Sequence, residues 1–192
     1  MNIKLRLLLF ASVFGNFGSA LFGPIYAFFV QEIGGNIIVA SVSFAIYTLV
    51  FALLTTFMGR LEDTKFNREK MVFIGYLILS ISNLLFIFVQ KPLDLYLLQA
   101  LMGIGVAIVA PAWEALYSLA LDKGKESSEW SYWNASIGIA ASVAALLGGV
   151  IVSYYGFKTL FIIMSAFHFI STLIASSLLK QSRIKKFKKR IN

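Results

Sequence analysis

The 192-residue chain has no cysteine, one histidine, three prolines and nine acidic residues. Without cysteine it has no disulfide framework, no thiolate metal site and no thiol nucleophile. One histidine and so few carboxylates leave little material for a metal cluster or an acid–base pair. No nucleotide-binding loop, nucleophile elbow, zinc motif or pair of catalytic carboxylates occurs. The sequence therefore predicts a protein that is not an enzyme and that needs no cofactor and no metal.

Charge is scarce throughout the chain, and apolar residues are abundant. They make up 59% of the chain, against 14% charged residues, whereas a soluble domain averages roughly 45–50% and about 25%. A membrane span needs about 20 mostly apolar residues. Six segments meet this length: 6–30, 37–58, 71–90, 93–121, 131–154 and 158–179. The predicted fold is an all-α membrane protein with six transmembrane helices in residues 1–179 and a polybasic tail, 180–192.

The basic residues predict the orientation of these helices. With the N-terminus inside, fifteen of the seventeen Lys and Arg residues fall on the cytoplasmic side, and only Lys91 and Lys158 fall on the other. Short cytoplasmic loops are typically rich in Lys and Arg. We therefore expect a multi-pass inner-membrane protein with both termini cytoplasmic. The net charge of +8 then reflects topology and contact with the lipid bilayer, and no nucleic-acid partner is expected.

Two short patterns repeat along the chain. Gly18 is followed after four residues by Gly23-Pro24, and Gly105 is followed after four residues by Ala110-Pro111. Both pairs are offset by 87 positions, which predicts two three-helix units of inverted topology, a feature of transporters. The prolines predict kinks. A purely structural kink and a hinge for alternating access both remain open.

Glu114 is a carboxylate inside a predicted span, where an uncompensated charge is costly. It is expected either to bind a substrate cation or a proton, or to form a structural hydrogen bond or reach cytoplasmic water. Gln99 and Gly103 share its helix face by steps of three and four. Such a face forms either a cavity wall or a close helix seam. Asn16 and Tyr26, in the first segment, are further candidate contacts.

Isolated polar residues, tryptophans and small residues predict three structural features. Asn83 and His168 are isolated polar groups, which more often form interhelical hydrogen bonds than ligand sites. Trp130 and Trp133, at the start of segment 131–154, are expected at the lipid headgroups. Small residues including Gly148 and Gly149 give the same segment a smooth side for close helix packing.

Residues 59–70 form a charged turn between two apolar runs. They resemble the loop between helices two and three of the major facilitator superfamily, usually Gly-x-Leu-Ala-Asp-Arg-x-Gly-Arg-Arg. Gly59, Leu61, Asp63 and Arg68 match, while Thr64, Phe66 and Asn67 depart from the pattern. The resemblance implies that Asp63, with Gly59 and Arg68, belongs to a cytoplasmic latch between two halves of a transporter.

Two further segments resemble this family. Gly103 and Gly105 fit its Arg-x-x-Gln-Gly-x-Gly-Ala pattern, with Gln99 in place of the family's Arg, a residue often tied to proton coupling in the family. Gly148-Gly149 resembles the end of its antiporter motif, with Ala144-Ala145 replacing Gly-Pro. The resemblance covers the N-terminal six-helix half of a family whose members normally have twelve helices.

The sequence therefore predicts a half-size transporter that moves a small solute by alternating access, as a homodimer or paired with a second six-helix half. Whether a proton or another cation is coupled stays open. The alternatives are a non-transporting accessory or scaffold subunit, and the N-terminal fragment of a twelve-helix transporter. The predicted substrate or ion contacts are Asn16, Tyr26, Gln99, Trp113 and Glu114.

Overall fold

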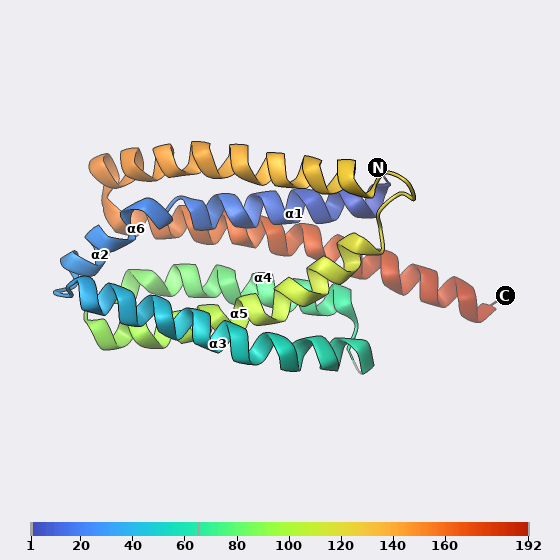
Figure 1. Cartoon of the computed structure of the whole chain (residues 1–192), viewed down its shortest axis with the longest axis horizontal. Coiled ribbons are helices and arrows are strands. Elements are labelled where there is room, and N and C mark those ends of the chain that lie inside the picture. The colour runs from blue at the N-terminus through green and yellow to red at the C-terminus, as the bar shows by residue number, and fades with distance from the viewer. Residues whose placement is uncertain (1, 65, 192) are drawn as a thin grey trace.

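Long helices form nearly all of the chain in the computed structural model (Figure 1). The structure describes residues 2–64 and 66–191, with side chains as far as residue 180. Most of the predicted basic tail therefore lies outside the described side chains. No strand occurs within these described ranges. The elements are α1 (Ile3–Ala20), η1 (Gly23–Ile25), α2 (Tyr26–Glu32), α3 (Ile37–Thr64), α4 (Arg68–Leu85), η2 (Phe86–Phe88), α5 (Pro92–Ser118) and α6 (Glu126–Ile191).

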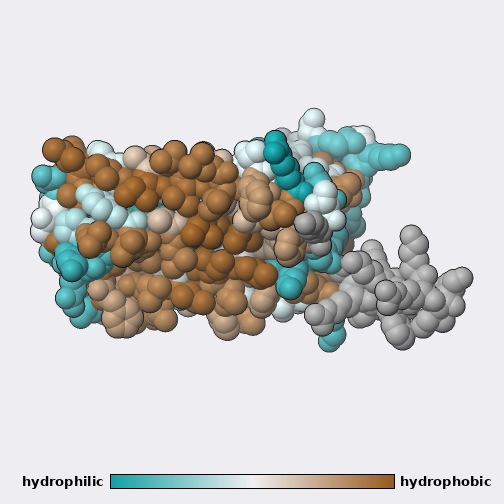
Figure 2. Space-filling model, turned by 90° about the horizontal axis from the view of Figure 1, so that it is seen from below, coloured by the Kyte–Doolittle hydropathy of each residue, from teal (hydrophilic) through white to brown (hydrophobic). Residues whose placement is uncertain are grey.

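Five helical segments of the described chain are long and apolar enough to cross a membrane: Ile3–Glu32, Ile37–Thr64, Arg68–Phe88, Pro92–Ser118 and Glu126–Lys180. The first four correspond to the first four predicted spans, with ends that differ by a few residues. The fifth is 55 residues long and contains both remaining spans. Figure 2 shows apolar side chains across the middle of one face and hydrophilic side chains towards its two ends. The protein is an all-helical, multi-pass membrane protein.

The fifth segment reverses direction at Gly156 (Figure 1). Gly156 has φ 75° and ψ 172°, a conformation that side chains with a Cβ atom rarely adopt. A straight helix of this length would measure about 80 Å, more than twice the roughly 30 Å of a bilayer core. The reversal divides α6 into two shorter runs of opposite direction (Figure 1).

The two predicted hinges differ in backbone structure. Gly23 and Pro24 lie in η1, so the first apolar segment is broken into α1 and α2. Pro111 instead lies within α5, which remains helical from Pro92 to Ser118. The missing N–H of a proline removes one helical hydrogen bond in either case, but only the first segment leaves the α-helical conformation.

Two apolar clusters pack the bundle, one towards each end. The cluster at the N-terminal end includes Leu5, Val72 and Tyr117. The opposite cluster is rich in phenylalanine, and Phe22 meets Phe161 edge to face with ring centroids 5.3 Å apart. Aromatic pairs prefer such geometry, which adds stabilisation beyond the buried area.

The N-terminus, the α3–α4 turn and the α5–α6 loop lie at the same end of the bundle (Figure 1). Asn2 Nδ2 donates to the Ala120 carbonyl over 2.6 Å. Lys4 Nζ pairs with Glu69 Oε1 over 3.0 Å. These contacts fix the start of α1 against α4 and against the residues that follow α5.

Candidate functional site

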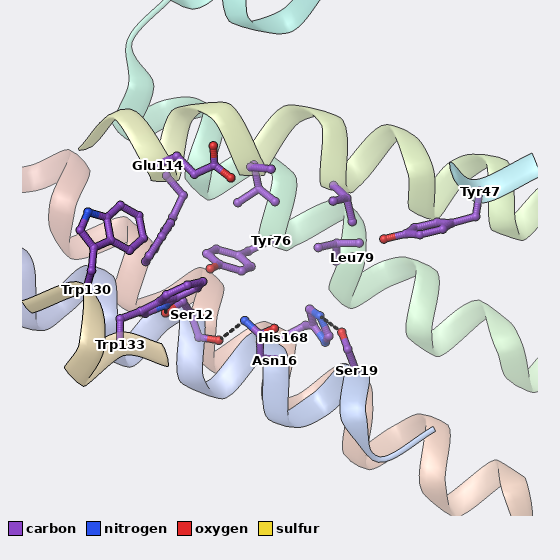
Figure 3. Close-up of a pocket in the computed structure, with 15 residues that line it drawn as sticks. Ser12, Asn16, Ser19, Tyr47, Tyr76, Leu79, Glu114, Trp130, Trp133 and His168 are labelled. Carbon is purple, nitrogen blue, oxygen red and sulfur yellow. Dashed lines mark hydrogen bonds between the residues drawn. The ribbon is translucent and has the colours of Figure 1, made fainter. Parts of the chain in front are cut away.

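A cavity of about 450 Å³ lies among α1, α3, α4, α5 and α6 (Figure 3). Its lining is apolar and aromatic with a few polar groups, the composition typical of small-molecule sites. The lining residues are Ser12, Gly15, Asn16, Ser19, Tyr47, Tyr76, Leu79, Val106, Val109, Ala110, Trp113, Glu114, Trp130, Trp133 and His168.

α1 contributes a polar stripe to the cavity. Ser12, Asn16 and Ser19 all line it, because steps of four and three residues return to the same helix face. Asn16 Nδ2 donates to the Ser12 carbonyl over 2.8 Å. Asn16 was predicted from the sequence and the two serines were not, although all three share one helix face by their spacing.

An aromatic cluster forms the wall nearest the N-terminal end. Trp113 stacks on Tyr117 at 4.7 Å and lies 5.2 Å from Trp133, ring centre to ring centre. The Trp113 indole N–H donates to the Leu8 carbonyl over 3.0 Å, and this bond joins α5 to α1. Trp130 packs against the same rings, 5.5 Å from Trp133. Trp130 and Trp133 both line the cavity (Figure 3), and their expected level at the headgroups stays a prediction.

Glu114 extends from α5 at this aromatic wall (Figure 3). Its carboxylate makes no ion pair with another described residue. Aromatic ring faces attract cations, and a carboxylate adds a full negative charge beside them. This part of the cavity can therefore hold a flat, apolar cation.

His168 lies deeper in the bundle, where it joins three helices. Its side chain is almost fully buried, 3.4 Å from Ser19 Oγ on α1 and 3.3 Å from Asn83 Nδ2 on α4. A Cβ atom on Gly18 would lie 2.9 Å from its ring. His168 and Asn83 thus form interhelical hydrogen-bond contacts, as predicted from the sequence.

Tyr26 and Gln99 lie outside the main cavity. Gln99 Nε2 donates to the Tyr26 hydroxyl over 2.9 Å, and this hydroxyl also hydrogen-bonds Ser43. Both residues line a neighbouring hollow of about 230 Å³, which shares Ser19 and Tyr47 with the cavity. Of the five predicted contacts, the structure brings Asn16, Trp113 and Glu114 together and places the other two in this hollow.

The predicted packing glycines differ in their surroundings. A Cβ atom would lie 2.7 Å from the Tyr47 carbonyl oxygen at Gly103, 3.0 Å from Leu79 at Gly105 and 1.9 Å from the Leu21 carbonyl oxygen at Gly148. At Gly149 it would meet no described atom within 4 Å. Three of these glycines lie in close helix contacts, and Gly149 faces open space.

The predicted latch residues lie in the turn between α3 and α4. Arg68 Nη2 pairs with Asp63 Oδ1 over 2.7 Å, and the Asp63 side chain is 72% exposed. A Cβ atom on Gly59 would have no neighbour within 4 Å among the described atoms. Lys65 lies outside the described residues. The carboxylate of Asp63 is thus held by its own turn and remains accessible from outside.

Comparison with known proteins matches residues 8–190 to the Major Facilitator Superfamily. The chain is 24% identical over 161 residues to the uncharacterized MFS-type transporter YitZ of Bacillus subtilis, a match that covers 82% of this chain and 96% of YitZ. It is 29% identical over 164 residues to the multidrug resistance protein MdtG of Proteus mirabilis, covering 82% of this chain and 40% of that protein. A third relative is the multi-drug resistance efflux pump PmrA homolog of Lactococcus lactis, 29% identical over 115 residues, which are 60% of this chain and 28% of that protein.

The matches therefore span nearly all of YitZ but less than half of the two drug-resistance proteins. The family match covers almost the whole chain, and the structure is an apolar, all-helical bundle around a lined cavity. The chain belongs to the Major Facilitator Superfamily, whose members are membrane transporters rather than enzymes.

Proposed function

We propose that this protein is a half-size transporter that moves a small solute by alternating access as a dimer of six-helix units. The observation that carries this proposal is the cavity of about 450 Å³, whose lining combines Glu114 with three tryptophans. A carboxylate in the lining of a largely apolar cavity favours occupation by a cation or a proton.

The solute is proposed to be an aromatic cation with apolar surface. Trp113, Trp130 and Trp133 provide ring faces, and Glu114 provides the counter-charge. The cavity volume lies in the range of sites for drug-sized ligands. Two of the relatives are named for multidrug resistance, which agrees with this class of solute. The smaller hollow at Tyr26 and Gln99 would take a second part of the same solute, while the coupling ion stays open.

Six spans in two inverted repeats are part of this proposal. The reversal at Gly156 supports a division of the fifth segment into two spans. The helix contacts support the repeat: Gly18 approaches Met164 and His168, and Gly105 approaches Ile78 and Leu79. Gly18 and Gly105 are 87 positions apart. Moving Met164 and His168 back by 87 positions gives 77 and 81, and Ile78 and Leu79 lie between these two positions. This agreement supports a repeat in which Gly18 and Gly105 are equivalent.

The seam between two units is proposed along α3 and the first run of α6. Both leave large apolar side chains exposed: Ile37, Phe44, Leu49 and Leu53 on α3, and Ile139 and Leu146 on α6. Tyr47 of α3 and Trp133 of α6 also line the cavity, so a second unit placed on these helices would close it. In a homodimer these faces of two copies would meet around an axis along the membrane normal, the relation between the two halves of larger family members. Pairing with a different six-helix half would use the same faces.

The end that carries Lys4, Arg60 and Arg68 is proposed to face the cytoplasm. Asp63 would then latch the two units on that side.

Reconstitution tests the proposal directly. The full chain in proteoliposomes should move ethidium, an aromatic cation, under a proton or sodium gradient, and its mass in nanodiscs should equal two chains. A single chain per nanodisc, together with no solute movement under either gradient, would refute the proposal and favour an accessory role.

A further inference from the structure

The hydroxyl groups in the described lining of the cavity differ in their hydrogen bonds. They belong to Ser12, Ser19, Tyr47 and Tyr76. The two serine hydroxyls contact other side chains of the lining, Trp133 in one case and His168 in the other. The two tyrosine hydroxyls form no hydrogen bond with a described residue (Figure 3). Two phenol groups of the cavity therefore have hydrogen-bonding capacity to spare.

Tyr76 of α4 is the more deeply buried of the two. It is 6% exposed, whereas Tyr47 is half-buried and also borders the neighbouring hollow. The Tyr76 ring packs against α1, since a Cβ atom on Gly15 would lie 3.0 Å from its Cε1. In Figure 3 the ring points into the cavity between Glu114 and Asn16. Buried polar groups are rarely left unpaired, so the partner of this hydroxyl must come from the contents of the cavity.

Acceptor oxygens on two other helices are also available to a solute. Asn16 donates from Nδ2 to the Ser12 carbonyl, which leaves its Oδ1 able to accept. The Glu114 carboxylate makes no ion pair or hydrogen bond within the described part of the chain. The Tyr76 oxygen can accept as well as donate. Helices α1, α5 and α4 thus each offer the cavity an acceptor oxygen, and a solute with several N–H donors matches them.

We propose that Tyr76 binds the solute, and that the solute is an aromatic cation with amino groups on its rings. A ring amino group donates an N–H hydrogen bond to the Tyr76 oxygen, while the tryptophans contact the flat ring system. A site that pairs a buried polar group with its ligand discriminates strongly against ligands that leave this group unpaired. Tyr76 therefore selects aminated cations over equally apolar cations without amino groups. This inference rests on the proposed function, because it specifies the solute of the same cavity.

Two cations of nearly the same shape separate this hydrogen bond from packing. Ethidium carries ring amino groups, and its desamino analogue has hydrogen atoms in their place. Titration calorimetry on the full chain in nanodiscs measures the affinity of each, and the wild type should bind ethidium more tightly than the analogue. Tyr76→Phe should weaken ethidium binding about threefold to tenfold, the value of one hydrogen bond. It should bind the analogue at least as tightly as the wild type does, because no buried hydroxyl is then left unpaired.

Two other tyrosines provide matched controls. Tyr132 is exposed on α6 and does not line the cavity, so Tyr132→Phe should bind both cations as the wild type does. Tyr117 lies in the same apolar cluster as Tyr76, but its hydroxyl donates to the Glu129 carbonyl over 2.7 Å. Tyr117→Phe should therefore lower the melting temperature. Tyr76→Phe should keep the wild-type melting temperature, because it removes no hydrogen bond between described residues.

Several results would overturn the inference. Equal weakening of both cations by Tyr76→Phe would show that the residue acts by packing, and a fall in melting temperature as large as that of Tyr117→Phe would show a structural hydrogen bond. Equal affinities of the wild type for ethidium and its analogue would overturn it without any variant. All these results leave cation binding, and with it the proposed function, intact. Binding of neither cation by the wild type would instead refute the proposed solute class and this inference together.

Discussion

A Cβ atom placed on Gly148 would lie 1.9 Å from the backbone oxygen of Leu21. This distance is far below any van der Waals contact, and the obstructing atom belongs to the backbone just beyond α1. The first run of α6 and the end of α1 can approach this closely only because residue 148 has no side chain. Close approach through small residues is a general route to helix association in membranes.

Gly148→Ala should therefore destabilise the protein. Overpacking of a tight contact typically costs about 1–3 kcal/mol, and backbone cannot yield as a flexible side chain would. The neighbouring Gly149→Ala is the control, because its Cβ atom would meet no described atom within 4 Å. Thermal unfolding of both variants in the same detergent measures the difference. Equal melting temperatures would contradict the close contact.

Glu114→Gln tests the charge in the cavity. The amide keeps the size and hydrogen-bonding ability of the side chain but removes its negative charge. We expect ethidium to bind about tenfold more weakly, equivalent to about 1.4 kcal/mol, with little change in stability, since Glu114 makes no ion pair with another described residue.

Glu32→Gln provides the control for this substitution. Glu32 is exposed at the end of α2 and does not line the cavity. The Glu32→Gln variant should therefore bind ethidium with the same affinity as the wild type. Unchanged binding by Glu114→Gln would assign Glu114 a structural role.

Hydropathy and composition were sufficient to predict the helical membrane fold, because a span in lipid must satisfy its backbone hydrogen bonds internally, as an α-helix does. The lining of the cavity could be predicted only in part. Glu114 was identifiable, since a lone carboxylate within an apolar run is conspicuous. Trp130 and Trp133 were placed at the headgroups because tryptophan commonly lies there. Their inward position depends on how α6 rotates against α1, where the Trp133 indole N–H donates to Ser12 Oγ over 2.9 Å.

Glu62 shows the same limit of prediction from sequence. Beside Asp63 it looks like another solvated charge in a polar turn. Yet it is only 6% exposed, at the end of a helix that packs against α5 from much later in the chain. Local pattern predicts local structure well, whereas contacts between helices depend on rotations that no short pattern encodes.

Tyr26→Phe tests the hydrogen-bonded group in the smaller hollow. The substitution leaves the side chains of Ser43 and Gln99 without their shared partner, and both are buried. Leaving a buried polar group unsatisfied costs about 1–3 kcal/mol. We expect a corresponding fall in melting temperature. Tyr154→Phe, at an exposed tyrosine on α6, should have no effect, and equal stability of the two variants would show that the hydroxyl of Tyr26 contributes nothing.

Ser171→Ala tests how strongly polar contacts hold α6 to α1. Ser171 Oγ donates to the Ala11 carbonyl over 2.8 Å in the buried interface. Interhelical hydrogen bonds in membrane proteins contribute about 0.6 kcal/mol on average, so a small loss of stability is expected. Ser176→Ala is the matched control, because that exposed hydroxyl bonds only to Leu173 of its own helix. Unfolding in a denaturing detergent, measured for both variants and the wild type, should rank Ser171→Ala lowest. A lower stability for Ser176→Ala would mean that helix packing, rather than this hydrogen bond, holds the two helices together.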